Sequence, residues 1–188
     1  KYSKPLKSVF TDYAFDKEKS DLLDVWLFAN CELCITTGTG PDLISIVYKR
    51  PVLAINYVPL GTLFSWGEAL HAPKNLYWKE TGLTLSWKEH LENSFHHTKS
   101  YEDAGIDVID LNSEEIVDIV NEMISRINKT FFDYDDDSIV QNKFWKIGKQ
   151  SEHFNLREPS SALEYDFIHP CSRIALSYVR NNLEWLQY

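Results

Sequence analysis

The sequence predicts an α/β fold in which helices flank a mainly parallel sheet. Short, apolar, β-branched runs alternate with helical patterns over the first 130 residues, and this alternation is typical of parallel sheets with buried strands. Two of the runs, residues 33–37 and 52–56, are joined by one short helix. A connection of this length permits only a tight strand–helix–strand crossover.

The first element is a predicted helix over residues 20–30. Ser20 is a favourable N-cap, and Asp21 and Asp24 add negative charge where the helix dipole favours it. Apolar side chains cover most of the helix circumference, so we expect this helix to be well buried. The run at 33–37 then ends in threonine and is typical of a buried strand.

A glycine turn follows and leads into the second helix. The turn has the sequence Gly-Thr-Gly at 38–40, and the helix covers 42–49. Pro41 suits the first helical position, and Asp42 suits the first turn. The strand at 52–56 then completes a unit of strand, turn, helix and strand.

The rest of the chain contains further helices with clear start signals and one more strand. Ser86-x-x-Glu89 forms a capping box, and Asn112-x-x-Glu115 opens an amphipathic helix. The predicted series is an irregular segment over 59–79, a helix over 86–95, a strand over 106–111, the amphipathic helix over 112–127, an acidic loop over 131–138 and a final helix over 172–186.

The number of visible strands is small for a complete domain of this class. Three or four strands are recognisable, whereas a doubly wound domain has about five or six. The chain of 188 residues begins with Lys1 and has its single methionine at Met123. We therefore expect the sequence to be a fragment of a two-domain protein.

Composition excludes several classes of function. Lys and Arg number 19 against 28 Asp and Glu, and the net charge of −9 disfavours nucleic acid as the main partner. No apolar stretch approaches the roughly 18 residues of a membrane span. The three cysteines, Cys31, Cys34 and Cys171, indicate reduced thiols in a cytoplasmic protein rather than a disulfide scaffold. A redox role for Cys31-x-x-Cys34 is disfavoured because Cys34 falls in a predicted strand, and a zinc site would need two more ligands nearby.

The best candidate site lies at the carboxyl end of the strand at 33–37. Ligands of open parallel sheets bind beyond the carboxyl ends of the strands. The glycines of the turn at 38–40 let a ligand approach the backbone, and free N–H groups with the helix dipole favour an anion such as a diphosphate. Thr36, Thr37 and Thr39 could add hydroxyl donors. A purely structural strand-to-helix turn would use the same residues.

A larger pattern surrounds this turn. Ala29-Asn30-Cys31, the Thr-Gly turn, Arg50-Pro51-Val52 and Asn56-Tyr57-Val58-Pro59-Leu60 follow one another in order. This order resembles the C-terminal, donor-binding domain of GT-B glycosyltransferases, and the match looks closest to bacterial glycosyltransferases associated with surface polysaccharide synthesis. The moderately specific part of the resemblance covers residues 20–60.

The resemblance implies a fold, a ligand and a division of the chain. Residues 1–130 would form a Rossmann-like domain that binds a nucleotide sugar, and 131–188 an acidic loop and helices that pack on it or bridge from it. The implied activity is transfer to a glycan or lipid-linked acceptor, with an N-terminal domain or partner chain supplying the catalytic base and no cofactor besides the donor. The implied donor-binding residues are Thr36, Thr37, Gly38, Thr39, Gly40, Asn56 and Tyr57.

Two alternatives remain open at this point. A UDP-N-acetylglucosamine 2-epimerase shares the GT-B core, but its ribose-binding carboxylates would fall on Leu43 and Ile44, where this sequence has none. A non-catalytic assembly module with a degenerate GT-B fold would use exposed aromatics and the C-terminal helix with Trp185 as an interface.

Other polar residues are weaker candidates. Trp66, His71 and Lys74 fall in the predicted irregular segment, where loops could contact a base, sugar or phosphate. The segment 133–137 contains Asp-x-Asp twice, but no apolar strand precedes it. We therefore expect a solvated acidic loop there rather than a metal site.

Overall fold

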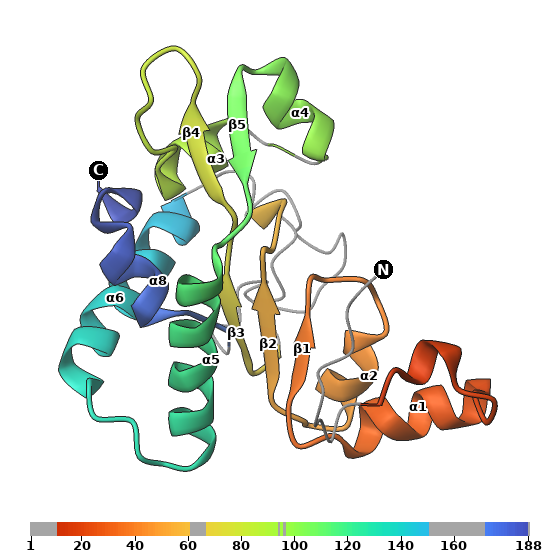
Figure 1. Cartoon of the computed structure of the whole chain (residues 1–188). Helices are drawn as coiled ribbons and strands as arrows, with labels where there is room; N and C mark the ends of the chain where they lie inside the picture. Colours follow the sequence, from red (N-terminus) through yellow and green to blue (C-terminus); the bar gives the residue numbers. More distant parts are fainter. Residues whose placement is uncertain (1–10, 61–66, 94, 96, 151–171, 188) are drawn as a thin grey trace, which may run out of the picture.

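A computed structural model of the chain describes residues 11–60, 67–93, 95, 97–150 and 172–187. Its main sheet has four strands in the order β1-β2-β3-β6, and all three pairings are parallel (Figure 1). The elements are η1 (Tyr13–Phe15), α1 (Asp21–Asn30), β1 (Cys34–Thr36), α2 (Asp42–Val47), β2 (Val52–Ile55), β3 (Ala69–Ala72), β4 (Asn75–Trp78), α3 (Trp87–Glu92), α4 (Thr98–Asp103), β5 (Ile106–Ile109), α5 (Ser113–Ile127), α6 (Tyr134–Gln150), β6 (Arg173–Ile174), α8 (Leu176–Asn181) and η3 (Leu183–Leu186).

The predicted unit of strand, turn, helix and strand is confirmed. β1 and β2 pair in parallel with Cys34 opposite Val52, and α2 is the crossover between them. The prediction of an irregular segment over 59–79 is wrong, because β3 and β4 lie within these residues. A histidine and two alanines make β3 a weak strand pattern, yet all four of its residues are buried.

A second, smaller sheet holds the predicted strand at 106–111. β5 pairs antiparallel with β4, and Tyr77 lies opposite Asp107. Leu76, Phe95 and Tyr101 belong to a separate apolar cluster beside this sheet. The strand was therefore predicted correctly, but it lies outside the main parallel sheet.

The C-terminal part departs from the prediction in two places. The segment predicted as an acidic loop includes the first turn of α6, where three aspartates complement the helix dipole. The predicted final helix over 172–186 is interrupted: β6 pairs with β3 through Leu70 and Arg173 before α8 and η3 begin. Local helical spacing did not reveal that Arg173–Ile174 would extend the main sheet.

The main core lies where α3, α6 and η3 meet. The ring of Trp87 stacks on Phe144 with centroids 4.9 Å apart and on Trp185 with centroids 5.8 Å apart. The same apolar cluster includes Leu53 of β2, so side chains from both sides of residue 130 share one core. Trp185 is only 1% exposed, so its side chain is not available for the interface that the assembly-module alternative would use.

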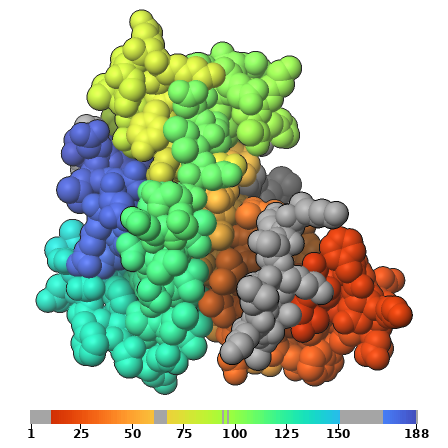
Figure 2. Space-filling model, viewed as in Figure 1, coloured from red at the N-terminus to blue at the C-terminus, as the bar shows by residue number. Residues whose placement is uncertain are grey.

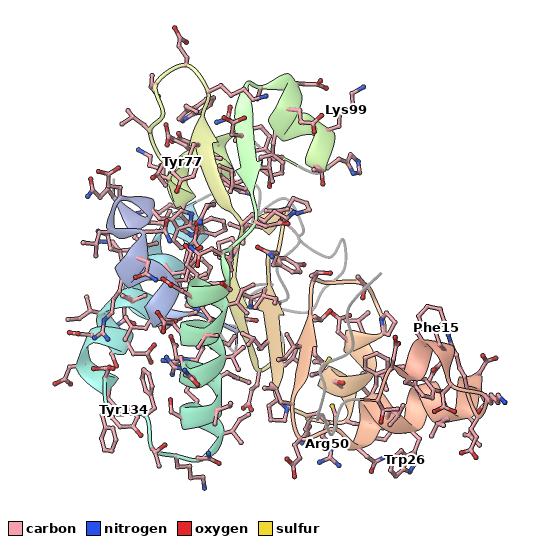
Figure 3. All side chains as sticks on the ribbon, viewed as in Figure 1. Phe15, Trp26, Arg50, Tyr77, Lys99 and Tyr134 are labelled. Carbon is pink, nitrogen blue, oxygen red and sulfur yellow. The ribbon has the colours of Figure 1, made fainter. Side chains whose placement is uncertain are left out.

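The expectation that the first helix is well buried is also wrong. Ala29 is the only buried residue of α1, whereas Leu22 is 81% and Trp26 57% exposed. The helix packs beside α2 next to the edge strand β1 and forms a lobe at the rim of the molecule (Figures 1 and 2). Trp26 projects from it away from the rest of the molecule (Figure 3).

Candidate functional site

The predicted turn begins with a side-chain hydrogen bond from Thr36. Its hydroxyl oxygen accepts from the N–H of Gly38 at 3.0 Å and donates to Oδ2 of Asp42 at 3.2 Å. Gly38 and Gly40 have φ values of 83° and 96°, a region that favours glycine because it has no Cβ. The local sequence therefore sets the shape of this turn before any distant residue contributes.

Tyr57, which follows β2, packs against the turn. A Cβ placed on Gly38 would lie 2.5 Å from Cε2 of Tyr57, so only glycine permits this approach. The buried ring of Tyr57 meets His71 edge-on with centroids 5.3 Å apart, and its N–H donates to the carbonyl of Ala72 at 3.3 Å. The structure thus brings together the two predicted segments that contain Gly38 and Tyr57.

Asn56 has a structural contact at the same edge. Its backbone has a left-handed φ of 52°, a region that asparagine tolerates better than most residues. Its Oδ1 accepts from the N–H of Leu111 at 2.8 Å. Asn56 therefore connects the end of β2 to the segment that leads into α5.

The exposed part of the turn carries the hydrogen-bond donors. Thr37, Thr39 and Gly40 are exposed, and the N–H groups of Thr39 and Gly40 make no hydrogen bond within the described residues. The carboxylate of Asp42 is buried beside the turn, and its Oδ1 accepts from the N–H of Leu43 at 3.1 Å. The turn can therefore donate to an anion, while the charge of Asp42 opposes one.

The burial of His71 excludes the ligand contact considered for it and agrees with the packing role that was the alternative, whereas a phosphate contact by Lys74 stays untested. His71 lies in β3 and is fully buried, and this burial lowers its pKa to about 4. Lys74 follows β3 and pairs with Asp110 at 2.6 Å. Trp66, the third predicted contact, lies outside the described residues.

The acidic segment is paired with arginines, and the expectation of a solvated loop is wrong. Arg180 pairs with Asp133 at 3.3 Å and with Asp136 at 2.7 Å. Asp137 is buried and pairs with Arg126 and Arg173. No group of three metal-ligating side chains is found among the described residues.

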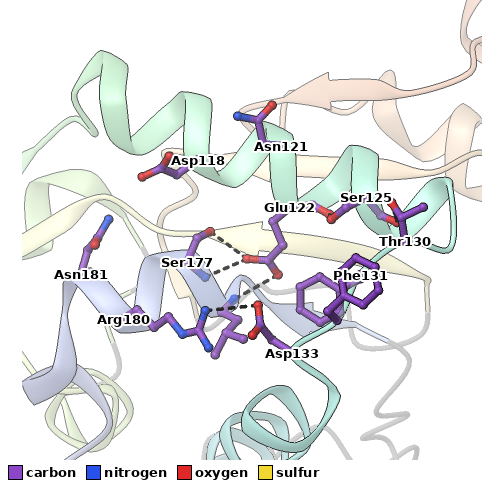
Figure 4. Close-up of a pocket in the computed structure, with 12 residues that line it drawn as sticks. Asp118, Asn121, Glu122, Ser125, Thr130, Phe131, Asp133, Ser177, Arg180 and Asn181 are labelled. Atoms are coloured by element: carbon purple, nitrogen blue, oxygen red, sulfur yellow. Dashed lines mark hydrogen bonds and ion pairs between the residues drawn. The ribbon is translucent and has the colours of Figure 1, made fainter.

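A pocket between α5 and α8 contains a carboxylate that the sequence analysis missed. In Figure 4, Oε2 of Glu122 accepts from the N–H and hydroxyl of Ser177, at 2.7 and 2.8 Å. Its Oε1 accepts from the N–H of Leu176 at 3.1 Å and from Arg126 at 2.8 Å. The carboxylate thus holds the start of α8 and also pairs with Arg126. The available signal was an acidic residue beside Met123 on the apolar face of an amphipathic helix.

The two described cysteines are free thiols. Cys34 is buried in β1, and burial raises the pKa of its thiol. The sulfur of Cys31 lies 3.6 Å from the hydroxyl oxygen of Ser45. A raised pKa opposes the thiolate that redox chemistry needs. Cys171 lies outside the described residues.

Comparisons with protein-family models, with curated proteins and with solved structures give no match. Within the described residues, no helix combines the length and apolar character that crossing a bilayer requires. The geometry of the site and the α/β fold with its parallel four-stranded sheet are therefore the basis for assigning a function.

Proposed function

We propose that the turn at 36–40 binds the diphosphate of a nucleotide sugar, and that the chain provides the donor-binding half of a GT-B-like glycosyltransferase. The observation that carries this proposal is an exposed glycine turn at the carboxyl edge of the parallel sheet, with unpaired N–H groups on Thr39 and Gly40 within the described residues. Such groups suit phosphate oxygens. The resemblance of residues 20–60 to GT-B donor domains points to the same ligand.

The turn would act on the leaving group. Negative charge grows on the diphosphate as the bond to the sugar breaks, and donors positioned toward that charge lower the barrier. The hydroxyls of Thr37 and Thr39 can add to the two N–H groups. Because the buried Asp42 opposes an anion, affinity depends on these donors acting together. Neither threonine nor glycine can serve as a general base, so the proposal assigns only donor binding to this turn.

Calorimetric titration with UDP, GDP, CMP and their sugars tests the proposal. Thr39→Val removes one exposed hydroxyl at nearly constant volume, and Thr98→Val at the start of α4 is a matched control, because Thr98 is also exposed. We expect a nucleoside diphosphate to bind and to raise the Tm. Thr39→Val should weaken binding about tenfold, since a hydrogen bond to a charged group is lost, and Thr98→Val should not. Failure of every nucleotide to bind, or equal affinities in the two variants, would contradict the proposal.

A further inference from the structure

A second hollow lies at the opposite edge of the main sheet, next to the amino ends of its strands. Its volume is about 760 Å³, a size suited to a small organic molecule. Ala69 and Arg173, the first residues of β3 and β6, line it together with Arg50, which precedes β2. Figure 3 shows Arg50 at the lower end of the sheet, whereas the turn at 36–40 follows the other end of β1. This hollow, here called the amino-edge pocket, is therefore separate from the proposed donor site.

Positive side chains are concentrated in the amino-edge pocket although the protein is acidic. The chain has a net charge of −9 and only five arginines, and three of those arginines line the pocket. Lys49 lines it as well, and among the described residues that line the pocket Glu68 is the only one with a carboxylate. The three arginines are Arg50, Arg126 and Arg173. This composition favours an anionic ligand.

The cations differ in how much of their hydrogen-bonding capacity the protein already uses. Arg126 uses most of its donors within the protein, because Glu122 and Asp137 accept four hydrogen bonds from its three nitrogens. Arg173 pairs with Asp137 through Nη2, but its Nε is buried and has no partner within the described residues. A buried donor without an acceptor is costly, so this Nε adds an unsatisfied donor beside the pocket within the described part of the chain.

Two further cations have donors to spare. Arg50 uses its Nε to donate to the carbonyl of Ala29 at 2.7 Å, and its terminal nitrogens have no hydrogen bond within the described part of the chain. The side chain of Lys49 is exposed and makes no ion pair there. Lys49 and Arg50 therefore line the pocket with donors that no described residue uses, and Arg173 lines it as well.

The rest of the pocket is apolar. Ile46 and Val47 of α2, Met123 and Ile127 of α5, and Pro51 line it. Val47 is 68% exposed and Ile127 38% exposed, so both offer apolar surface that a ligand could cover. The pocket thus combines cationic side chains with exposed apolar surface. From this combination we infer that the amino-edge pocket binds a small organic anion, whose carboxylate or phosphate group contacts the cations and whose apolar part packs against α2 and α5.

Titration with octanoate, octyl phosphate, octanol and inorganic phosphate tests this inference by calorimetry at low ionic strength. The two octyl anions combine both features, and each of the other probes lacks one of them. We expect octanoate or octyl phosphate to bind at least tenfold more tightly than octanol or inorganic phosphate, and added salt to weaken the binding. Comparable affinity for octanol, or for inorganic phosphate, would overturn the inference.

Substituted variants distinguish a loss of ligand binding from a loss of stability. Lys49 has a left-handed φ of 55°, so Lys49→Gly removes the charge where glycine is the more relaxed residue. Its Tm should stay the same or rise, while affinity for the octyl anion falls about tenfold. Lys88→Gln is the matched control, since Lys88 is exposed in α3 and does not line the pocket. Unchanged affinity in Lys49→Gly would overturn the inference. The outcome does not depend on nucleotide binding at the turn.

Discussion

Gly38 is the residue at which the two predicted parts of the donor site meet. Its missing Cβ makes room for the ring of Tyr57, and its N–H is held by Thr36. The sequence predicts that a glycine at this position lets a ligand approach the backbone. In the structure it is a neighbouring aromatic ring that comes close to Gly38, while the exposed donors lie one and two residues further along at Thr39 and Gly40.

Alanine substitutions at Gly38 and Gly40 should differ in their effect on the free energy of unfolding. Gly38→Ala should destabilise the fold by about 2–4 kcal/mol, because the new Cβ meets Tyr57 and the backbone has a positive φ. Gly40→Ala also has a positive φ but meets nothing within 4 Å, so we expect a loss of about 1–2 kcal/mol. Urea denaturation at pH 7 measures both values. Equal losses would mean that the contact with Tyr57 contributes nothing.

His71 predicts a pH dependence of stability. Burial lowers its pKa from 6.5 to about 4, so the folded protein holds this ring neutral while the unfolded chain takes up a proton below pH 6.5. The contribution is therefore fully present above pH 6.5 and is lost as the pH falls toward 4. One shift of this size corresponds to about 3 kcal/mol.

The contribution of His71 is isolated by comparing variants. His71→Gln should flatten the fall in the free energy of unfolding between pH 6.5 and 4, whereas His97→Gln should not, because His97 is exposed. Denaturant titrations at several pH values give the comparison. Parallel curves for His71→Gln and the unmodified chain would show that another group causes the fall.

At the scale of elements, α1 contradicts the usual rule for apolar helices. A helix with apolar side chains on most faces is normally buried, yet α1 buries only Ala29. It packs beside α2 next to an edge strand, so one side alone is covered. The apolar composition of the helix was readable from the sequence, but the absence of a covering element among the described residues was not.

Truncations in α1 should therefore have little effect on the stability of this chain. Leu22→Ala is expected to change the free energy of unfolding by less than about 0.5 kcal/mol, because Leu22 is 81% exposed. Leu53→Ala in β2 removes a side chain with no exposed surface and should cost about 2–5 kcal/mol. Denaturant midpoints provide the test. A large loss for Leu22→Ala would mean that α1 is covered in solution.

At the scale of the whole molecule, a buried polar network joins elements that are distant in sequence. Glu122 of α5 holds the start of α8, and Arg126 connects it to Asp137 of α6. Gln141 of α6 bonds both backbone groups of Ile174 in β6, at 2.8 and 3.0 Å. The network therefore secures the fourth strand and positions Arg173 beside the amino-edge pocket.

Breaking this network should be costly. Burial alone would raise the pKa of Asp137, but Arg126 and Arg173 outweigh that effect and hold the pKa below its ordinary value. Asp137→Asn leaves Arg126 without one of its partners, so we expect a loss of about 3 kcal/mol at pH 7, which shrinks as acid protonates the native carboxylate. Asp118→Asn on the exposed side of α5 should be neutral. Thermal or urea unfolding of both variants checks this prediction.

Some features of this protein follow from short stretches of sequence. The caps at Ser20, Ser86 and Asn112 and the Thr36–Gly38 turn depend on hydrogen bonds between residues two or three positions apart. The parallel pairing of β1 and β2 follows from the short crossover between them. Because these interactions are local, the positions of the caps and of the candidate turn could be predicted from the sequence.

Other features were decided by tertiary structure because their partners are remote. β3 becomes a strand by pairing with β2 and β6, and β6 becomes one by pairing with β3. The buried Glu122, the exposed face of α1 and the arginines of the amino-edge pocket depend on which elements come to lie beside them. Burial and charge pairing are properties of neighbours in space, so the spacing of residues along the chain could at most place Glu122 on the apolar face of its helix and could not identify its partners.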